Sequence, residues 1–194
     1  SHDRDRRLIS LSMPHYIPAM LKRFRPNGLR PASSPSLYIP PKYGSTAPQI
    51  FPVDTSAAAT PAQAKRLSEE IGSLLYYARV VDPLLLPATT TLACLQARPT
   101  VATLDAMTRL LGYAQAHPNA VQVIRPSPML LQTQSDASYL SLPNSGSKAG
   151  GHHILGNHDP SFSNAAVEFV STRIPVVVSS AAEAELAAAF GNAK

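Results

Sequence analysis

Apolar residues recur every three or four positions through the middle of this chain, then alternate with polar residues over its last third. The first pattern predicts helices, because that spacing places side chains on one helical face, and the second predicts strands. Helices are expected from Pro61 to about Ala78 and at Thr89–Ala97 and Thr100–Ala116; strands are expected at Val121–Ile124, Met129–Ser135, Lys148–Leu155 and Ala166–Thr172, with 175–178 continuing the last. One more helix follows from about Ala181, so the order of elements predicts an α+β fold with a mostly antiparallel sheet.

The first sixty residues carry other patterns. Arg7–Met13 alternates in the manner of a half-buried strand, and a short basic helix is predicted over His15–Phe24. From Pro26 to Thr60 the chain is rich in proline, which disrupts helix interiors and central strands, so this stretch is interpreted as an extended connector. The chain is therefore divided into a strand-helix arm with its connector (1–60), a small helical unit (61–118) and a sheet with one helix (119–194).

Two helix starts are marked by capping residues. Thr60-Pro61-Ala62-Gln63 combines a capping threonine, a proline at the first position and a glutamine at the third. Ser180 with Glu183 three residues later has the form of a capping box. In the helix that this second box begins, the expected buried stripe consists of Ala182, Leu186, Ala189 and Phe190.

The charge is basic and gathers near the N-terminus. The formal net charge is +5, and residues 1–30 hold seven of the seventeen lysines and arginines, against Asp3 and Asp5. A polyanion such as nucleic acid is the partner that such a balance suits. The candidate phosphate-binding residues are Arg4, Arg6, Arg7, Lys22, Arg23 and Arg25. For the last three the alternative is an ordinary solvated helix end, where basic side chains interact favourably with the helix dipole.

Cys94 is the only cysteine, which excludes an intrachain disulfide and a cysteine-based zinc site. Its apolar setting predicts a buried, inert thiol. No apolar run approaches the roughly 20 residues of a membrane-spanning helix, and the charged N-terminus lacks an apolar signal region. These features favour a soluble intracellular chain in a reducing compartment, and do not say which one.

Two acidic residues are candidates for a magnesium site. Asp136 ends a predicted strand, and Glu185 lies at the start of the last helix, where Glu183 already has a capping role. If both carboxylates met at one end of the sheet, their hard oxygens could hold Mg²⁺ for hydrolysis. Two acids alone make a weak site, and an aspartate after a strand is also a common turn former. The interpretation of Asp136 as a turn residue therefore stays open.

A histidine cluster invites a zinc hypothesis, which the spacing disfavours. His152 and His153 are adjacent on a predicted strand and therefore point to opposite faces, while His158 and Asp159 follow it. Adjacent strand residues cannot chelate one ion together, so structural roles are favoured for these side chains.

Three motifs in this order resemble the polyprotein of copia-type retrotransposons. The stretch from Arg7 to Phe24 resembles a reverse-transcriptase segment just past the polymerase site, and Glu70–Arg79 resembles the "vGsLlYl…tRpD" stretch of its thumb and connection region. Ser135-Asp136-Ala137-Ser138 and the 179–185 stretch resemble the "SDAD" and "SSTEAEY" signatures of the ribonuclease H domain. The resemblance covers nearly the whole chain.

The resemblance implies a ribonuclease H-like sheet, left incomplete, whose ancestral reaction is metal-dependent cleavage of RNA in RNA–DNA hybrids. It assigns metal-ligand roles to Asp136 and Glu185 and implies Mg²⁺ as cofactor if the site functions. The polymerase aspartates would precede residue 1, and a third ribonuclease H acid would follow Lys194, so we expect no hydrolysis by this chain alone. The alternatives are a domesticated structural or RNA-binding subunit of a larger ribonucleoprotein assembly, or a gene fragment.

Overall fold

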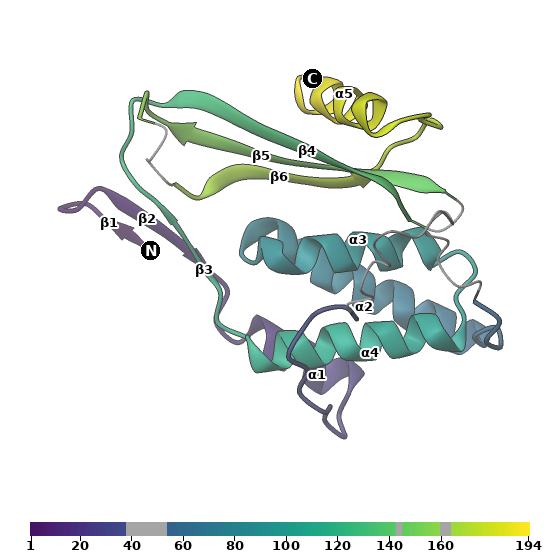
Figure 1. Ribbon diagram of the computed structural model, residues 1–194. Coiled ribbons are helices and arrows are strands. Elements are labelled where there is room, and N and C mark those ends of the chain that lie inside the picture. The colour runs from purple at the N-terminus through teal and green to yellow at the C-terminus, as the bar shows by residue number, and fades with distance from the viewer. Residues whose placement is uncertain (38–53, 143–144, 160–163) are drawn as a thin grey trace. The chain divides into compact units, whose positions relative to one another are not determined.

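The fold class is α+β, as predicted. A computed structural model describes residues 1–37, 54–142, 145–159 and 164–194 (Figure 1). Its strands are β1 (His2–Asp3), β2 (Leu8–Ser12), β3 (Val121–Ile124), β4 (Leu130–Leu142), β5 (Gly146–Gly156) and β6 (Ala166–Arg173). Its helices are α1 (Tyr16–Phe24), α2 (Pro61–Val80), the 3-10 turn η1 (Pro83–Leu85), α3 (Leu86–Leu95), α4 (Val101–Ala116) and α5 (Ala181–Asn192). Residues 175–178 do not continue β6.

The chain forms two compact units that differ from the three consecutive segments expected. One unit contains 1–14, 76–87 and 119–194, and the other contains 15–75 and 88–118. The N-terminal strand belongs to the first unit because β2 pairs antiparallel with β3, Ile9 opposite Ile124. Helix α1 belongs to the second because it contacts α4. Residues 38–53 of the predicted connector lie outside the described residues.

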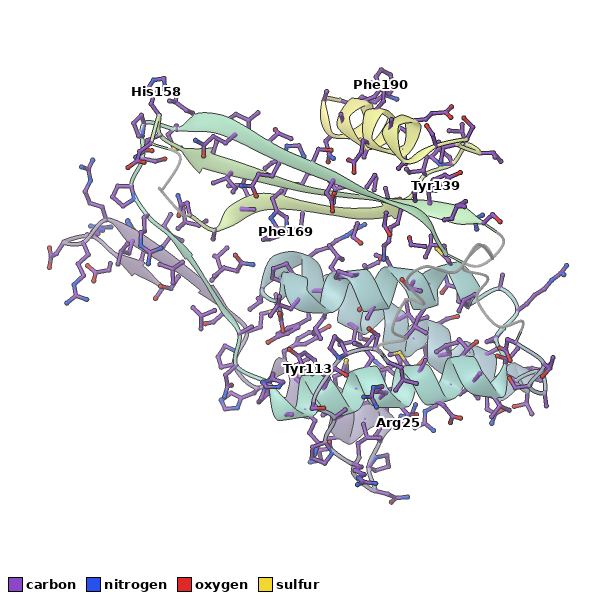
Figure 2. All side chains as sticks on the ribbon, viewed as in Figure 1. Arg25, Tyr113, Tyr139, His158, Phe169 and Phe190 are labelled. Carbon is purple, nitrogen blue, oxygen red and sulfur yellow. The ribbon has the colours of Figure 1, made fainter. Side chains whose placement is uncertain are left out.

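The described residues of the first unit form two three-stranded antiparallel sheets, ordered β1-β2-β3 and β4-β5-β6. In the second sheet, β5 is central and pairs with β4 (Asp136 opposite Gly150) and with β6 (His152 opposite Phe169). Helix α5 packs against β4 and β5 on one face of this sheet. Figure 2 shows Phe190 projecting from α5 away from the strands, and Phe169 on the other face of the sheet.

The buried side of α5 is not the stripe expected from the sequence. Small residues line the contact: Ala184 and Ala188 are fully buried and pack with Ala149 of β5, Ile174 and Val178. The expected stripe is exposed, with Leu186 at 71% and Phe190 at 65% of their surface accessible. Central strand β5 presents Ala149 and Gly151 to the helix, and such a strand admits a close helix only through short side chains.

The second unit is built from helices, and the cap predicted at Thr60 is present. Gln63 Oε1 accepts from the Thr60 N–H at 2.9 Å, and Thr60 Oγ1 accepts from the Gln63 N–H at 3.3 Å, which begins α2. Thr100 caps α4 in the same reciprocal way with Thr103. The core consists of buried apolar residues from α1 to α4: Ile17, Met20, Phe24, Leu67, Ile71, Leu74, Leu92, Met107, Leu110, Leu111 and Ala114. Cys94 is exposed on α3, which corrects the prediction of a buried thiol.

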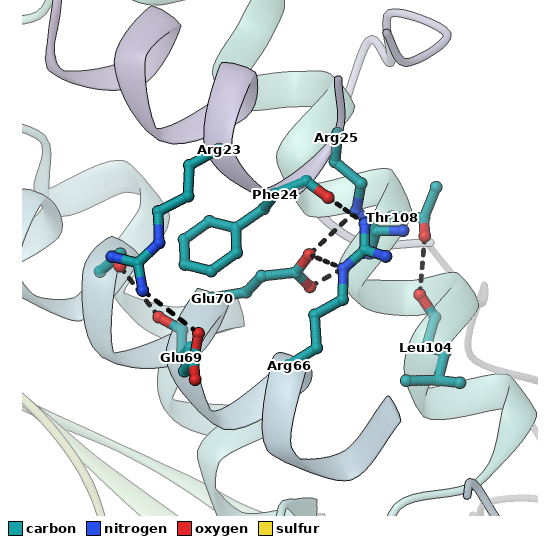
Figure 3. Close-up of polar contacts among 9 residues, drawn as sticks. Arg23, Phe24, Arg25, Arg66, Glu69, Glu70, Leu104 and Thr108 are labelled. Atoms are coloured by element: carbon teal, nitrogen blue, oxygen red, sulfur yellow. Dashed lines mark hydrogen bonds and ion pairs between the residues drawn. The ribbon is translucent and has the colours of Figure 1, made fainter. Parts of the chain in front are cut away.

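A buried carboxylate ties α1 to α2 within this unit (Figure 3). The Glu70 side chain is 1% exposed, and its Oε2 accepts from Arg25 Nη2 at 3.1 Å while its Oε1 accepts from Arg66 Nε at 3.2 Å. Arg25 Nε lies 3.0 Å from Glu70 Oε1 without hydrogen-bond alignment, so that contact is ionic. Arg66 also donates to the carbonyl of Phe24, the last residue of α1. Two guanidinium groups therefore compensate one desolvated carboxylate.

Candidate functional site

Asp136 lies in the middle of a strand, not at its end. Strand β4 continues to Leu142, and Asp136 pairs with Gly150 of β5 through the ladder. The sequence suggested an earlier end because Ser135, Asp136 and Ser138 resemble turn residues. Tyr139 has a strand-forming side chain, and the hairpin extends through an irregular step to the pair of Leu142 with Gly146. The alternative interpretation of Asp136 as a turn former is therefore wrong.

The side chain of Asp136 faces away from α5. Its neighbours face the helix: Ser135 Oγ accepts a hydrogen bond from Asn192 Nδ2 at 2.8 Å, and Ala137 packs against the Ala184–Ala188 cluster. Because side chains alternate along a strand, Asp136 between them points to the opposite face.

The two glycines of β5 that pair with this part of β4 also show that Asp136 faces away from α5. A Cβ on Gly151 would lie 2.1 Å from Asn192 Oδ1 of α5, whereas one on Gly150 would meet only backbone oxygens, the nearer at 3.9 Å. Gly151 therefore faces α5, and Gly150, the ladder partner of Asp136, faces away from it.

Glu185 and Glu183 behave differently at the start of α5. Glu183 acts in the cap: its N–H donates to Ser180 Oγ at 3.1 Å, and its Oε2 accepts from the N–H and Oγ of Ser179 at 2.6 and 2.7 Å. The Ser179 N–H, and then its hydroxyl, lower the pKa of the Glu183 carboxyl from its ordinary value of 4.5. Glu185 is exposed on α5 and does not take part in this cap.

The structure does not bring Asp136 and Glu185 together, because one lies on the far face of the sheet and the other on the helix covering the near face. Within the described ranges, no three histidine, cysteine, aspartate or glutamate side chains gather closely enough to hold a metal ion. The expected convergence of these two carboxylates is therefore corrected.

Asp136 opens onto a hollow within the first unit. The hollow has a volume of about 290 Å³, and its wall includes Gln134, Asp136, Gly150, His152 and Phe169 of the sheet. Among the described residues that line it, Asp136 is the one acidic side chain. The described lining offers one carboxylate together with the His152 imidazole, which suits polar recognition better than the metal-dependent hydrolysis that the resemblance implies.

The histidines on β5 point to opposite faces, as predicted. His152 packs edge-on against Phe169, with ring centroids 5.3 Å apart, on the face shared with Asp136. His153 Nδ1 lies 3.2 Å from Thr133 Oγ1 of β4, on the α5 side. Both side chains have neighbours on the sheet, consistent with structural roles.

Three of the six basic candidates gather in one turn. Arg4, Arg6 and Arg7 lie in the four residues that join β1 to β2, and all three are exposed. Asp3 organises this turn by accepting from the Arg6 N–H at 3.0 Å, and its carboxylate lies 3.9 Å from Arg6 Nε. That exposed pair is long and weak, so it leaves the guanidinium groups open to phosphate.

The other three candidates lie at the end of α1 and are less available. Arg25 is engaged by buried Glu70, as described above, so its predicted phosphate contact is contradicted. Arg23 lies over the Phe24 ring at 4.7 Å and pairs with Glu69 at 3.3 Å, an exposed contact. Lys22 is exposed on α1. A solvated helix end, the alternative left open by the sequence, describes Lys22 and Arg23.

Three anchoring residues, Asn192 and the Arg66–Glu70 pair, were missed from the sequence. Asn192 is 7% exposed and donates to Ser135 Oγ and to the Gly150 carbonyl at 2.9 Å, which fixes α5 on the sheet. Nothing in its local sequence marks it, since an asparagine near a helix end ordinarily suggests a cap. The Arg66–Glu70 pair was detectable, because oppositely charged residues four apart face each other on a helix.

Comparison with known protein families, with curated proteins and with solved structures finds no match. In the part of the chain that the structure describes, no helix combines the length and apolarity that crossing a membrane demands.

Proposed function

We propose that this chain is a retroelement-derived segment of copia-type reverse transcriptase and ribonuclease H lineage that binds RNA or RNA–DNA hybrids without cutting them. The observation that carries the proposal is the basic β1–β2 turn, defined by Arg4, Arg6 and Arg7. Three guanidinium groups within four residues, with Asp5 as the fourth, give the tip of a two-stranded ribbon a net positive charge. Arginine is well suited to phosphate because its planar fork donates two parallel hydrogen bonds.

The ribbon gives these arginines a defined support. β1 and β2 pair antiparallel, His2 opposite Ile9, and β2 pairs in turn with β3. The Ser10 N–H also donates to the Ser1 carbonyl at 2.8 Å. A tip held on a three-stranded sheet loses less conformational entropy on binding than a free tail of the same charge.

The separation of the carboxylates supports binding over catalysis. For Mg²⁺ to activate water, Asp136 and Glu185 would both have to coordinate it, and they lie on different sides of the β4-β5-β6 sheet. The same lineage is therefore proposed with a non-catalytic role, as an RNA-binding subunit of a larger ribonucleoprotein assembly.

The basic turn can be tested by removing its charge. In fluorescence anisotropy with labelled single-stranded RNA, the triple variant R4Q/R6Q/R7Q is expected to bind at least about tenfold more weakly than wild type near 100 mM salt. The slope of log K against log salt should flatten by up to about 2, at about 0.7 per lost phosphate contact. For an RNA–DNA hybrid as well, wild type should bind more tightly than the triple variant.

A variant of equal net charge provides the control. Arg30, Arg79 and Arg98 are exposed and lie outside the turn, so R30Q/R79Q/R98Q removes the same three charges. It should retain most of the affinity of the wild type. If the two triple variants bind RNA equally well, the turn is not the binding site and the proposal fails.

A further inference from the structure

Helix α5 carries a second apolar face on the side away from the sheet. At about 100° per residue, Leu186 and Phe190 fall opposite the buried Ala184 and Ala188. Leu186 is 71% and Phe190 65% exposed, and Figure 2 shows Phe190 directed outward. The flanking residues on this outer face, Ala182, Ala189 and Ala193, are small and exposed. Two large apolar side chains one turn apart, on a helix whose other side is already packed, indicate a docking surface.

The pattern along this outer face is self-complementary. Leu186 and Phe190 are placed symmetrically about position 188. When two such helices run antiparallel across a twofold axis, Leu186 of each copy therefore lies beside Phe190 of the other. The small residues at Ala182, Ala189 and Ala193 allow the helix backbones to approach closely. An isologous contact of this kind requires one surface to match itself, and this one does.

The charges on the face match the same antiparallel arrangement. Glu183 lies in the first turn of α5 and Lys194 follows two residues after its end, so the two charges stand at opposite ends of the Leu186–Phe190 pair. A second copy therefore brings its Lys194 to Glu183, and the reverse. Glu183 uses Oε2 for both of its bonds to Ser179, so Oε1 remains for a cross-copy ion pair. Lys194 Nζ already lies 4.4 Å above the Phe190 ring, at the edge of the apolar patch.

We propose that this outer face of α5 is the contact between two copies of the chain in a twofold-symmetric dimer. The inference does not depend on the proposed RNA binding. A single pair of short helices buries less than the roughly 1,600 Å² of a standard interface, so we expect a weak dimer with a dissociation constant on the order of 10–100 µM.

Sedimentation equilibrium of the full chain tests the dimer, with a reducing agent present because Cys94 is exposed. Wild type should change from monomer to dimer as its concentration rises through the micromolar range. Leu186→Glu and Phe190→Glu should each raise the dissociation constant at least about tenfold, since each places a charge in the apolar centre. Phe190→Ala, which adds no charge, should also weaken the dimer, and Lys194→Glu should weaken it by about threefold.

Leu84→Glu is the matched control, because Leu84 is 69% exposed on η1 and lies off α5. The dimer dissociation constant of Leu84→Glu should equal that of wild type. Circular dichroism should confirm that every variant is folded. A wild-type chain that stays monomeric at about 0.5 mM would overturn the proposal. So would folded Leu186→Glu and Phe190→Ala variants that dimerise as tightly as wild type, or a Lys194→Glu variant that dimerises more tightly.

Discussion

Replacing Glu70 with alanine is expected to lower the free energy of unfolding by about 3–5 kcal/mol, measured by urea denaturation followed by circular dichroism. The carboxylate is 1% exposed and is the shared partner of Arg25 and Arg66. Its removal leaves two guanidinium groups at the α1–α2 contact without their counter-ion, and Arg25 is only 20% exposed. Uncompensated charge in a partly desolvated site costs far more than the intact ion pair contributes.

The neighbouring residue supplies the comparison. Glu69 pairs with Arg23 at 3.3 Å, but both side chains are well exposed, so Glu69→Ala should change the free energy of unfolding by less than about 1 kcal/mol. The two variants remove the same chemical group from successive positions of α2. If Glu70→Ala proves no more destabilising than Glu69→Ala, the Arg25–Glu70–Arg66 cluster does not hold α1 to α2.

Gly151→Ala is expected to destabilise the first unit by about 3–4 kcal/mol. The new Cβ would overlap the Asn192 side chain, 2.1 Å from its Oδ1. The Asn192 amide would then have to leave the contact between α5 and the sheet. Two hydrogen bonds from Asn192 Nδ2, to Ser135 Oγ and to the Gly150 carbonyl, would be lost at about 1 kcal/mol each. Overpacking of the contact adds a further 1–2 kcal/mol or so.

Gly150→Ala makes the same chemical change on the opposite face of the sheet. The closest atoms to its Cβ would be backbone oxygens at 3.9 and 4.0 Å, which is ordinary van der Waals contact. Its cost should therefore stay below about 1 kcal/mol, and the lower backbone entropy of alanine in the unfolded chain favours stability. This pair of variants measures which face of β5 meets α5, and hence which face Asp136 occupies. Equal costs, or a larger cost for Gly150→Ala, would contradict that assignment.

The local elements could be predicted because their signals are local. The Thr60–Gln63 cap begins α2 where expected, and β3 spans Val121–Ile124 as its alternation indicates. The pairing of β2 with β3 could not be predicted, because it joins residues more than a hundred positions apart. No periodicity within either strand specifies such a partner.

The candidate site was predicted less well, for a reason that lies in the packing of α5. Hydrophobicity alone favours burying Leu186 and Phe190, yet the helix buries Ala184 and Ala188 against the sheet. The decisive constraint is Gly151 on β5, which brings the strand close to the helix and leaves room only for small side chains and Asn192. A sequence pattern shows which face is more apolar and does not show how much space the opposing strand leaves.

The central claim, that this chain binds hybrids without cutting them, is tested most directly with an RNA–DNA hybrid labelled on its RNA strand and incubated with Mg²⁺. A native gel reports binding, and a denaturing gel of the same sample reports cleavage. We expect the hybrid to be shifted by wild type and its RNA strand to remain full length, with Asp136→Asn giving the same result. Magnesium-dependent cleavage that is lost in Asp136→Asn would contradict the account, because Asp136 would then act in a nuclease site that its position on the sheet does not support.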